Sequence, residues 1–561
     1  MPSATSPDVA VPRPLSAARV ILASSLGTGF EWYDFFLYGS LADVLSKQFF
    51  SALNETNAFI FALLTFAAGF AVRPFGALLF GRLGDRVGRK KTFLITLVIM
   101  GTATVLVGLL PNYQRIGLAA PAILIALRLM QGLAIGGEYG GALIYVAEHA
   151  PPGARGGFTS WIPMTATLAL LLSLIVILIC RITLGDEFAV WGWRIPFLLS
   201  TVLLIVSVYI RLRLAESPVF ARMVAEGSRS HAPIRESFGE AKNLKRVLAV
   251  LAGTTAGQNV LWYGGQLYVL YFLTQTLKVE AATANLLLVP ALLIATPLYW
   301  IAGRLSDHIG RKPVVIAGML LAVLTYFPIY HAITHFANPA IEQAARNAPV
   351  TVLASPGDCS AQFDPIGRRR YTHSCDVAKS TLARFGVPYE TGRLPDGRVA
   401  TVRLGRGEYA RQLPSFAGDT LSAARFAQQN DDFAAELRQA LQAVGYPARA
   451  DPARVHYAML IVLITILAAY ATIVTGPLAA WLPELFPARI RYTAMSVPYH
   501  IGAGWFGGFM PAVTFALVAI TGDIYSGLWY PIIIIAVTVI AGAILLPETA
   551  GPRATEDMDR A

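Results

Sequence analysis

Residues 81–91 read Gly81-Arg-Leu-Gly-Asp-Arg-Val-Gly-Arg-Lys-Lys91, and a closely similar stretch, Gly303-Arg-Leu-Ser-Asp-His-Ile-Gly-Arg-Lys312, follows 222 residues later. Seven positions are identical between the two copies. Both copies lie between long apolar runs, so each is predicted to be a short basic loop that joins two membrane helices. The glycines allow two helices to end and turn within about ten residues, and the aspartate can face a helix N-terminus. The repeat therefore predicts a duplicated membrane protein.

A second pair of similar stretches locates an insertion. Residues 148–160 and 484–496 share four residues at an offset of 336: Glu148/Glu484, Pro151/Pro487, Arg155/Arg491 and Ser160/Ser496. This offset exceeds that of the first repeat by 114 residues. The second half is therefore predicted to carry about that many extra residues between its two landmarks.

The composition excludes a soluble globular protein. Of the 561 residues, 55% are hydrophobic and 14% are charged, and the mean hydropathy is +0.55. Such a chain is predicted to cross a membrane several times. The net charge of +11 is interpreted as a topology signal, because Lys and Arg gather in alternate loops. Three cysteines exclude a cysteine-rich scaffold and a zinc finger.

The apolar runs predict an all-α membrane protein with twelve transmembrane helices in two pseudo-symmetric six-helix halves. Each run is close to the 20 or so residues that a bilayer requires, and the basic loops place both termini in the cytoplasm. The predicted order is a cytoplasmic tail (1–18), the N-terminal half (19–213), a cytoplasmic linker (214–246), helices seven to nine (247–335), an insertion (336–455), helices ten to twelve (456–547) and a cytoplasmic tail (548–561).

The insertion is predicted to be a small α+β domain outside the cytoplasm. Phe433, Leu437 and Leu441 recur at helical spacing, and Leu394-Pro-Asp-Gly397 between two strand-like runs predicts a hairpin turn. Cys359 and Cys375 also lie in this region, in a compartment that permits disulfides. We favour a bridge between them over two free thiols.

Carboxylates inside the predicted spans are candidates for proton coupling. A charge at membrane depth costs at least about 2.5–3.5 kcal/mol. Glu31 and Asp34 are three residues apart on one face of the first span, and Glu138 lies in the fourth. Two carboxylates that are close together in a medium of low dielectric cannot both ionise cheaply, so one is expected to keep a proton. The alternative is that a carboxylate only pairs with a neighbouring arginine.

Polar and aromatic residues inside the spans are candidates to bind a substrate. Arg73 and Arg128 can pair with a carboxylate group, and structural pairing is the alternative for each of them. Arg128 is ten residues from Glu138, about 15 Å along a helix, so each must find its partner in another span. The substrate-binding candidates are Tyr33, Arg73, Arg128, Gln131, Gln258, Asn259, Tyr263 and His500.

The loop motif, in both of its places, resembles the major facilitator superfamily. The stretches Phe30–Phe35, Arg128–Glu138, Trp193–Phe197 and Glu484–Tyr492 resemble its bacterial metabolite:proton symporter family, which carries α-ketoglutarate, shikimate, citrate, and proline or betaine. The resemblance covers the spans but not residues 336–455. Span seven, around residues 258–266, also departs from the pattern of that family.

These features predict a symporter of the bacterial inner membrane that imports a small organic acid by alternating access. A zwitterion or betaine held by aromatic rings is the alternative substrate, and a receptor that senses ligand through the insertion is the alternative function. We expect no enzyme activity, cofactor, metal or nucleic acid, with the proton gradient as the energy source. The predicted cytoplasmic gate, with latching pairs Glu148/Arg155 and Glu484/Arg491, consists of Gly81, Asp85, Arg86, Arg89, Glu148, Arg155, Asp307, Arg311, Glu484 and Arg491.

Overall fold

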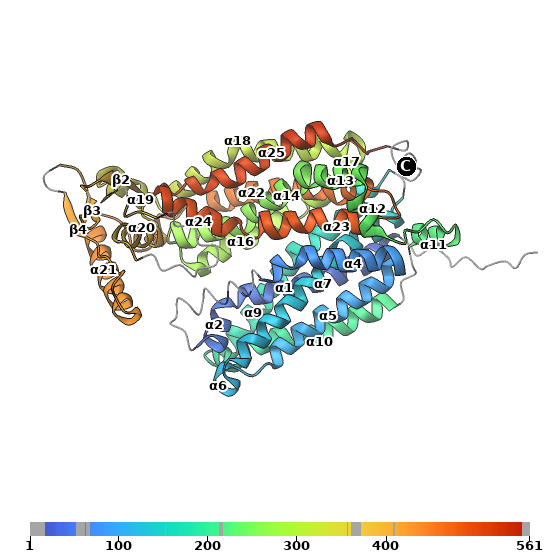
Figure 1. The fold of residues 1–561 in the computed structure, drawn as a ribbon, viewed down its shortest axis with the longest axis horizontal. Coiled ribbons are helices and arrows are strands. Elements are labelled where there is room, and N and C mark those ends of the chain that lie inside the picture. Colours follow the sequence, from blue (N-terminus) through green and yellow to red (C-terminus); the bar gives the residue numbers. More distant parts are fainter. Residues whose placement is uncertain are drawn as a thin grey trace, which may run out of the picture.

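The computed structural model describes residues 17–51, 62, 65, 68–151, 153–212, 217–355, 357–360, 372–395, 397–407 and 410–551. Most of these residues are helical, and the helices form two bundles that lie side by side (Figure 1). The N-terminal bundle contains α1 (Ala17–Ser40), α2 (Ala42–Phe49), α4 (Arg73–Val87), α5 (Arg89–Leu109), α6 (Tyr113–Ile116), α7 (Ala119–His149), α8 (Arg155–Thr159), α9 (Trp161–Leu184), η1 (Phe188–Gly192) and α10 (Arg194–Leu212).

The second bundle begins after the short helices α11 (Pro218–Ala225) and α12 (Pro233–Gly239). The first span of this bundle, the seventh predicted for the chain, consists of α13 (Ala241–Val250), η2 (Leu251–Thr255), α14 (Ala256–Tyr263), η3 (Gly264–Tyr268), α15 (Val269–Tyr271) and η4 (Phe272–Thr276). Its three η segments are π-helical. The remaining helices are α16 (Ala281–Ala295), α17 (Leu298–Ile309), α18 (Arg311–Ala337), α22 (Tyr457–Glu484), α23 (Arg491–Ile501), η6 (Gly502–Gly507), α24 (Met510–Thr521), η7 (Ser526–Leu528) and α25 (Trp529–Leu545).

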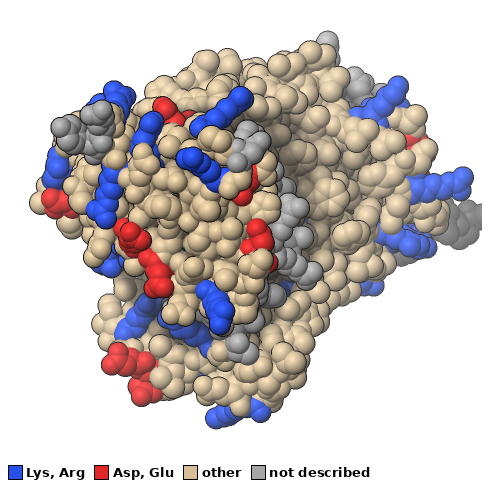
Figure 2. Space-filling view, turned by 60° about the vertical axis from the view of Figure 1, so that its left-hand side comes forward, with Lys and Arg blue, Asp and Glu red and all other residues tan. Residues whose placement is uncertain are grey.

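Eight helical segments among the described residues are long and apolar enough to cross a membrane. Large apolar side chains, such as Leu79, Ile182, Leu286 and Ile544, are exposed on the flanks of the bundles. Figure 2 shows charged side chains gathered toward the two ends of the molecule, with an almost uncharged flank between them. This distribution is what a bilayer of about 30 Å requires of a multi-pass membrane protein.

The two repeated stretches fold in the same way and are more helical than the predicted ten-residue loops. Helix α4 continues to Val87 and α5 begins at Arg89, so that Gly88 alone forms the turn. Gly310 has the same place between α17 and α18. The φ angles are 117° at Gly88 and 107° at Gly310, a region in which residues with a side chain are strained. Glycine at these positions makes the tight turn possible.

Residues 339–455, here called the insertion domain, lie at the end of the molecule opposite to the two repeated stretches (Figure 1). They contain α19 (Pro339–Asn347), α20 (Ser374–Phe385), α21 (Ala423–Ala443), η5 (Pro452–Arg454) and four strands: β1 (Val350–Ala354), β2 (Tyr389–Arg393), β3 (Thr401–Leu404) and β4 (Arg411–Pro414). A disulfide joins Cys359 to Cys375 at the start of α20. The predicted helical face is confirmed, because Phe433, Leu437 and Leu441 are buried in the core of the domain.

The predicted hairpin around residues 394–397 is wrong. The sheet order is β2-β1-β3-β4, so β1 lies between the two strands that were expected to pair. Strand β1 runs parallel to β2, with Val350 opposite Tyr389, and antiparallel to β3, with Val352 opposite Val402. The sequence of β1, Val-Thr-Val-Leu-Ala, is mostly apolar. This suits a central strand, because a central strand is more buried than an edge strand.

Close packing between α4 and α7 provides a test of the N-terminal bundle. A Cβ atom added at Gly136 would lie 2.3 Å from the backbone oxygen of Arg73, whereas one at Gly101 would meet only the flexible side chain of Leu204. We predict that Gly136→Val destabilises the protein by about 1–3 kcal/mol, because backbone cannot move aside as a side chain can. Thermal unfolding of the detergent-purified protein measures the effect. Gly101→Val is the matched control, and equal melting temperatures for the two variants would contradict this packing.

Candidate functional site

Two buried carboxylates connect the two bundles at the end that carries the repeated stretches, here called the gate end. Asp85 of the first repeat accepts hydrogen bonds from the backbone N–H groups of Tyr492 and Thr493, at 3.2 and 2.9 Å, and from the Thr493 hydroxyl at 2.8 Å. These groups lie in the first turn of α23, in the second bundle. Each aspartate was expected to face a helix N-terminus, and the structure places that helix in the opposite bundle.

Asp307 of the second repeat makes the equivalent contact in the reverse direction. Its carboxylate accepts hydrogen bonds from the backbone N–H groups of Gly156 and Gly157, at 2.8 and 2.9 Å, in the first turn of α8. A negative charge is favourable at a helix N-terminus, where N–H groups have no partner within the helix. The two aspartates therefore hold the bundles together through a pair of contacts related by the internal repeat.

The predicted latching pairs are exchanged between the two bundles. Arg491 pairs with Glu148 at 3.3 Å, and Arg155 lies 3.9 Å from Glu484. The expected pairs Glu148/Arg155 and Glu484/Arg491 each lie within one bundle, where a loop separates their two members. Pairing across the interface instead brings each arginine to a buried carboxylate of the other half.

Arg311 completes this cluster from the second repeat. Its guanidinium donates to Asp307 at 2.6 Å and pairs with Glu484 at 3.3 Å. The carboxylate of Glu548, after the last helix, accepts from the backbone N–H groups of Arg311 and Lys312, both at 2.9 Å. The start of α18 is therefore anchored to the segment that follows α25.

The remaining gate candidates have different surroundings. A Cβ atom at Gly81 would lie 2.9 Å from the Cα atom of Thr493, so glycine permits the close approach of α4 and α23. Arg86 is exposed on α4. The side chain of Arg89 lies outside the described part of the structure, so its role stays a prediction.

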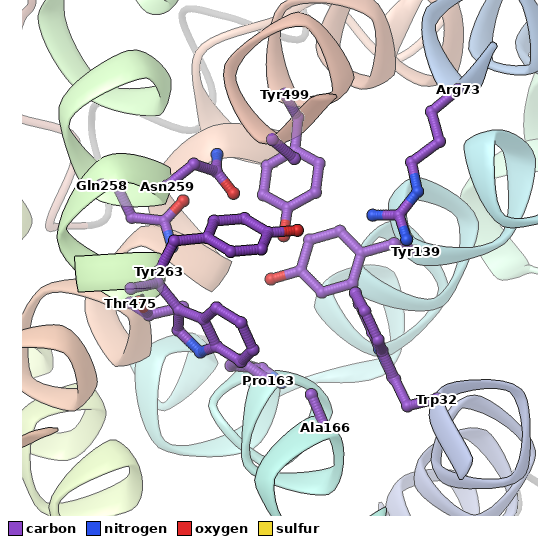
Figure 3. A pocket seen from close by; sticks show the side chains of 12 residues that line it. Trp32, Arg73, Tyr139, Pro163, Ala166, Gln258, Asn259, Tyr263, Thr475 and Tyr499 are labelled. Carbon is purple, nitrogen blue, oxygen red and sulfur yellow. Dashed lines mark hydrogen bonds between the residues drawn. The ribbon is translucent and has the colours of Figure 1, made fainter. Parts of the chain in front are cut away.

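A cavity lies between the two bundles. It is lined from both bundles by Trp32, Arg73, Tyr139, Pro163, Ala166, Gln258, Asn259, Trp262, Tyr263, Thr475, Tyr499 and Ala503. In Figure 3 the rings of Tyr139, Tyr263 and Tyr499 converge between Arg73 on one side and the amides of Gln258 and Asn259 on the other. The predicted candidates Arg73, Gln258, Asn259 and Tyr263 are therefore brought together at one place.

Arg73 supplies the only charged side chain among the lining residues that the structure describes. The residue is 1% exposed, and its Nε and Nη2 atoms have no hydrogen-bond partner in the described structure. Its guanidinium lies over the rings of Phe70 at 4.2 Å, Phe35 at 4.4 Å and Trp32 at 5.5 Å. Aromatic faces compensate part of the cost of burying the charge.

Aromatic rings from four helices line the cavity. Tyr139 and Tyr499 are stacked across the interface with ring centroids 4.3 Å apart. Trp262 meets Tyr263 edge to face at 5.1 Å, and its indole N–H donates to the Tyr299 hydroxyl at 3.1 Å. Tyr139 was not predicted as a binding residue, and only its position directly after Glu138 in a glycine-rich run marked it. Aromatic rings that line a cavity can bind an organic cation through their faces.

Asp34 lies away from the cavity, against the inner face of α10. It is 5% exposed and accepts a hydrogen bond from the Ser200 hydroxyl at 2.5 Å. Arg128 lies near it and donates to Gln131 at 2.5 Å, and Gln131 in turn donates to Thr104 at 2.7 Å. Arg128 and Gln131, which were expected to bind substrate, thus belong to the surroundings of Asp34.

Glu138 forms a buried ion pair with Arg211 and accepts a hydrogen bond from Thr96 at 2.9 Å. Arg211, which was not among the predicted candidates, lies in the last turn of α10 with 1% exposure. Its position at the end of an apolar run was the signal that could have identified it. A paired Glu138 favours the structural alternative for this carboxylate over proton coupling.

Two other candidates, Tyr33 and His500, do not line the cavity. Tyr33 is buried and donates to the backbone oxygen of Pro196 at 3.2 Å. His500 is 1% exposed beside the cavity, and neither ring nitrogen has a hydrogen-bond partner in the described structure. The side chain of Glu31 lies outside the described residues, so its proposed pairing with Asp34 stays a prediction.

Comparison with known proteins supports the interpretation of the fold. The family model described as "Sugar (and other) transporter" matches residues 20–259 and 440–561, and leaves out the intervening segment that contains the sheet. A proline/betaine transporter from Salmonella typhimurium is 36% identical over 321 residues, which cover 56% of this chain and 64% of that protein. A citrate-proton symporter from Salmonella typhi is 34% identical over 318 residues, 56% of this chain and 71% of that protein.

The chain thus spans somewhat less than two thirds of the proline/betaine transporter that it matches. Among solved structures, a double mutant of XylE superposes with a TM-score of 0.59 at 16% identity, over 96% of this chain and 98% of that chain. The partially occluded inward-open form of the xylose transporter XylE from E. coli gives a TM-score of 0.55 at 15% identity, over 96% and 99%. At these identities the likeness shows a shared fold.

The contacts of Asp85 provide a test of the gate end. We predict that Asp85→Asn leaves the protein folded but opens this end, because hydrogen bonds to a charged group contribute about 1.5–3 kcal/mol. The labelling rate of a cysteine in place of the buried Ser496 should rise about tenfold or more in this variant. Asp307→Asn should have a similar effect with a cysteine in place of Ser160. Unchanged labelling rates at both positions would show that the aspartates do not hold the gate closed.

Proposed function

Because the chain belongs to the sugar (and other) transporter family of the major facilitator superfamily, we propose that it is a proton-coupled symporter of a small zwitterion with one carboxylate and one ammonium group. The observation that carries this proposal is a cavity in which one buried guanidinium with free donors faces a wall of aromatic rings. The proline/betaine transporters among its relatives support the same class of solute.

Arg73 is the proposed partner of the solute carboxylate. A guanidinium presents its donors in a planar fork that matches a carboxylate, and Nε and Nη2 of Arg73 are unpaired. The sequence argument for an organic anion counted two arginines, but only Arg73 lines the cavity. One guanidinium neutralises one carboxylate, which favours a zwitterion over a di- or tricarboxylate.

Trp32, Trp262 and the three cavity tyrosines are the proposed partners of the ammonium group. Cation–π contacts contribute about 0.5–2 kcal/mol each when they are desolvated. The described lining residues include no carboxylate that would compete with the rings for the cation. A small organic acid is the second candidate, since Arg73 would bind one of its carboxylates equally and a citrate-proton symporter is also a relative.

Asp34 is the proposed proton carrier. Trp32 lines the cavity while Asp34, two residues further along α1, contacts Ser200 of α10. A movement of α1 that accompanies solute binding would therefore change the surroundings of the carboxylate. Each proton that enters down a membrane potential contributes about 2.3 kcal/mol per 100 mV, which is enough to concentrate a solute tens of fold.

The proposed topology has twelve spans in two halves, both termini in the cytoplasm and the insertion domain on the outer side of a bacterial inner membrane. The positive charges of the repeated stretches favour a cytoplasmic gate end, and the insertion domain lies at the opposite end. With the gate contacts made, the structure corresponds to a state closed toward the cytoplasm. Transport would then require these contacts to open while the other end closes, as alternating access demands.

The class of solute is tested by the external pH of lightly buffered vesicles that contain the purified protein. We predict that betaine or proline raises the external pH as protons enter with the solute, and that citrate and α-ketoglutarate do not. Arg73→Lys should abolish the response, because an ammonium cannot replace the planar fork. Alkalinisation by dicarboxylates alone would overturn the zwitterion assignment and restore the organic acid.

The proton carrier is tested separately from the solute. We predict that Asp34→Asn abolishes accumulation of labelled solute against a gradient but spares exchange of internal for external solute, because an amide neither binds nor releases a proton near neutral pH. Asp186→Asn, at an exposed position between spans, is the matched control and should accumulate normally. An Asp34→Asn protein that still concentrates solute in proportion to the pH gradient would exclude this residue.

A further inference from the structure

The insertion domain is attached to two spans that line the cavity. Helix α20 packs against both η4, at the end of span seven, and α24, at the end of span eleven. The backbone N–H of Tyr389 in β2 donates to the backbone oxygen of Gly522, directly after α24, at 2.9 Å. One small domain therefore contacts the ends of both spans on the side away from the gate.

Spans seven and eleven also carry a large part of the cavity wall. Gln258, Asn259 and Tyr263 come from span seven, and Tyr499 and Ala503 from span eleven. The two spans contact each other beside the cavity, where the Thr255 hydroxyl donates to the backbone oxygen of Pro498 at 2.9 Å. Any change in their relative position would alter the cavity.

Both spans are interrupted in a way that favours bending. Span seven contains three π-helical turns, η2, η3 and η4, and η3 begins directly after Tyr263. Span eleven contains one, η6. A π-helical turn departs from the regular hydrogen-bond ladder of an α-helix and is a common site of kinks. The segments beyond these turns need an external support to keep one position.

The attachment is close-fitting at two glycines with positive φ. A Cβ atom at Gly386, which follows α20, would lie 2.1 Å from the backbone oxygen of Thr276 at the end of η4. A Cβ atom at Gly522 would lie 2.0 Å from the backbone oxygen of Tyr389. In both places backbone meets backbone, so neither contact tolerates a side chain.

Lys278 adds polar contacts to the same interface. Its ammonium donates to the backbone oxygen of Arg384 at 2.7 Å, and its own backbone oxygen accepts from Ala450 at 3.0 Å. Burial, with a smaller contribution from the charges of Arg384 and Arg438, lowers the pKa of Lys278 to about 8. The loop after span seven is thus enclosed by the insertion domain from two sides.

We propose that the insertion domain is a clamp that fixes the ends of spans seven and eleven to each other, so that this side of the second bundle moves as one body. Span seven is then prevented from bending alone at η3 over the cavity. Opening and closing at this end proceed by movement of the two bundles relative to each other. The proposal assigns a role to a domain most of which lies outside the family match, and it does not depend on the identity of the solute.

The clamp is tested by the distance between spin labels on the ends of the two spans. Cysteines in place of the exposed Gln275 and Ile520 are labelled in a Cys180→Ala background, in which Cys359 and Cys375 remain bonded. We expect a single narrow distance that is unchanged when Asp85→Asn is added to open the gate. In Gly386→Val and in Gly522→Val, the width of the distance distribution should at least double.

Gly397→Val is the matched control, because Gly397 has a φ of 81° with nothing within 4 Å of an added Cβ atom. It introduces the same backbone strain in the insertion domain without touching a span, and the distance should stay narrow. A variant in which a short Gly-Ser loop replaces residues 339–455 should show the broad distribution. The same narrow distance in both glycine variants, or in a monodisperse deletion variant, would overturn the proposal.

Discussion

The structure depends on two carboxylates that bind the N-termini of helices in the opposite bundle. Asp85 and Asp307 each accept backbone hydrogen bonds from the first turn of a helix that begins beside the interface. The two contacts together hold the gate end closed, and the partners in each can be hydrated once the bundles separate. A contact of a few kcal/mol, made twice, gives a closed state that the binding of a solute and a proton can still reverse.

The sequence predicted the parts of this gate but not how they combine. The repeated stretches identified Asp85 and Asp307. The second pair of similar stretches, residues 148–160 and 484–496, identified Glu148, Arg155, Glu484 and Arg491. Their pairing across the interface could not be derived, because spacing along the chain reports only neighbours within one bundle. Arg211 was not predicted as the partner of Glu138 for a related reason, because its position at the end of an apolar run does not show whether it lies in the loop or in the core. Here Glu138 of α7 provides a buried partner.

The cavity shows a similar division between what could and could not be predicted. Polar residues of span seven were expected to face a cavity, and Gln258, Asn259 and Tyr263 line it. Arg73 and Arg128 carry the same side chain and are similarly buried, yet only Arg73 faces the cavity. Arg128 lies beside Tyr38 and Gln131. The rotation of each helix about its axis decides between these roles, and packing against several neighbours fixes that rotation. In the insertion domain, the strand order was missed because β1 lies far in sequence from the strands that it separates.

The buried charges near α1 suggest how the proposed solute site and the proposed proton site can be separate and still influence each other. Arg73 and Arg128 both contact the ring of Phe35, at 4.4 and 5.2 Å, one on the cavity side and the other beside Asp34. Water would screen the two guanidinium groups from each other, but the aromatic ring and its apolar neighbours hold them in a medium of low dielectric. A carboxylate that binds Arg73 therefore changes the potential at Arg128 without direct contact. The proposed solute site at Arg73 and the proposed titratable site at Asp34 therefore differ in location and still share one electrostatic environment.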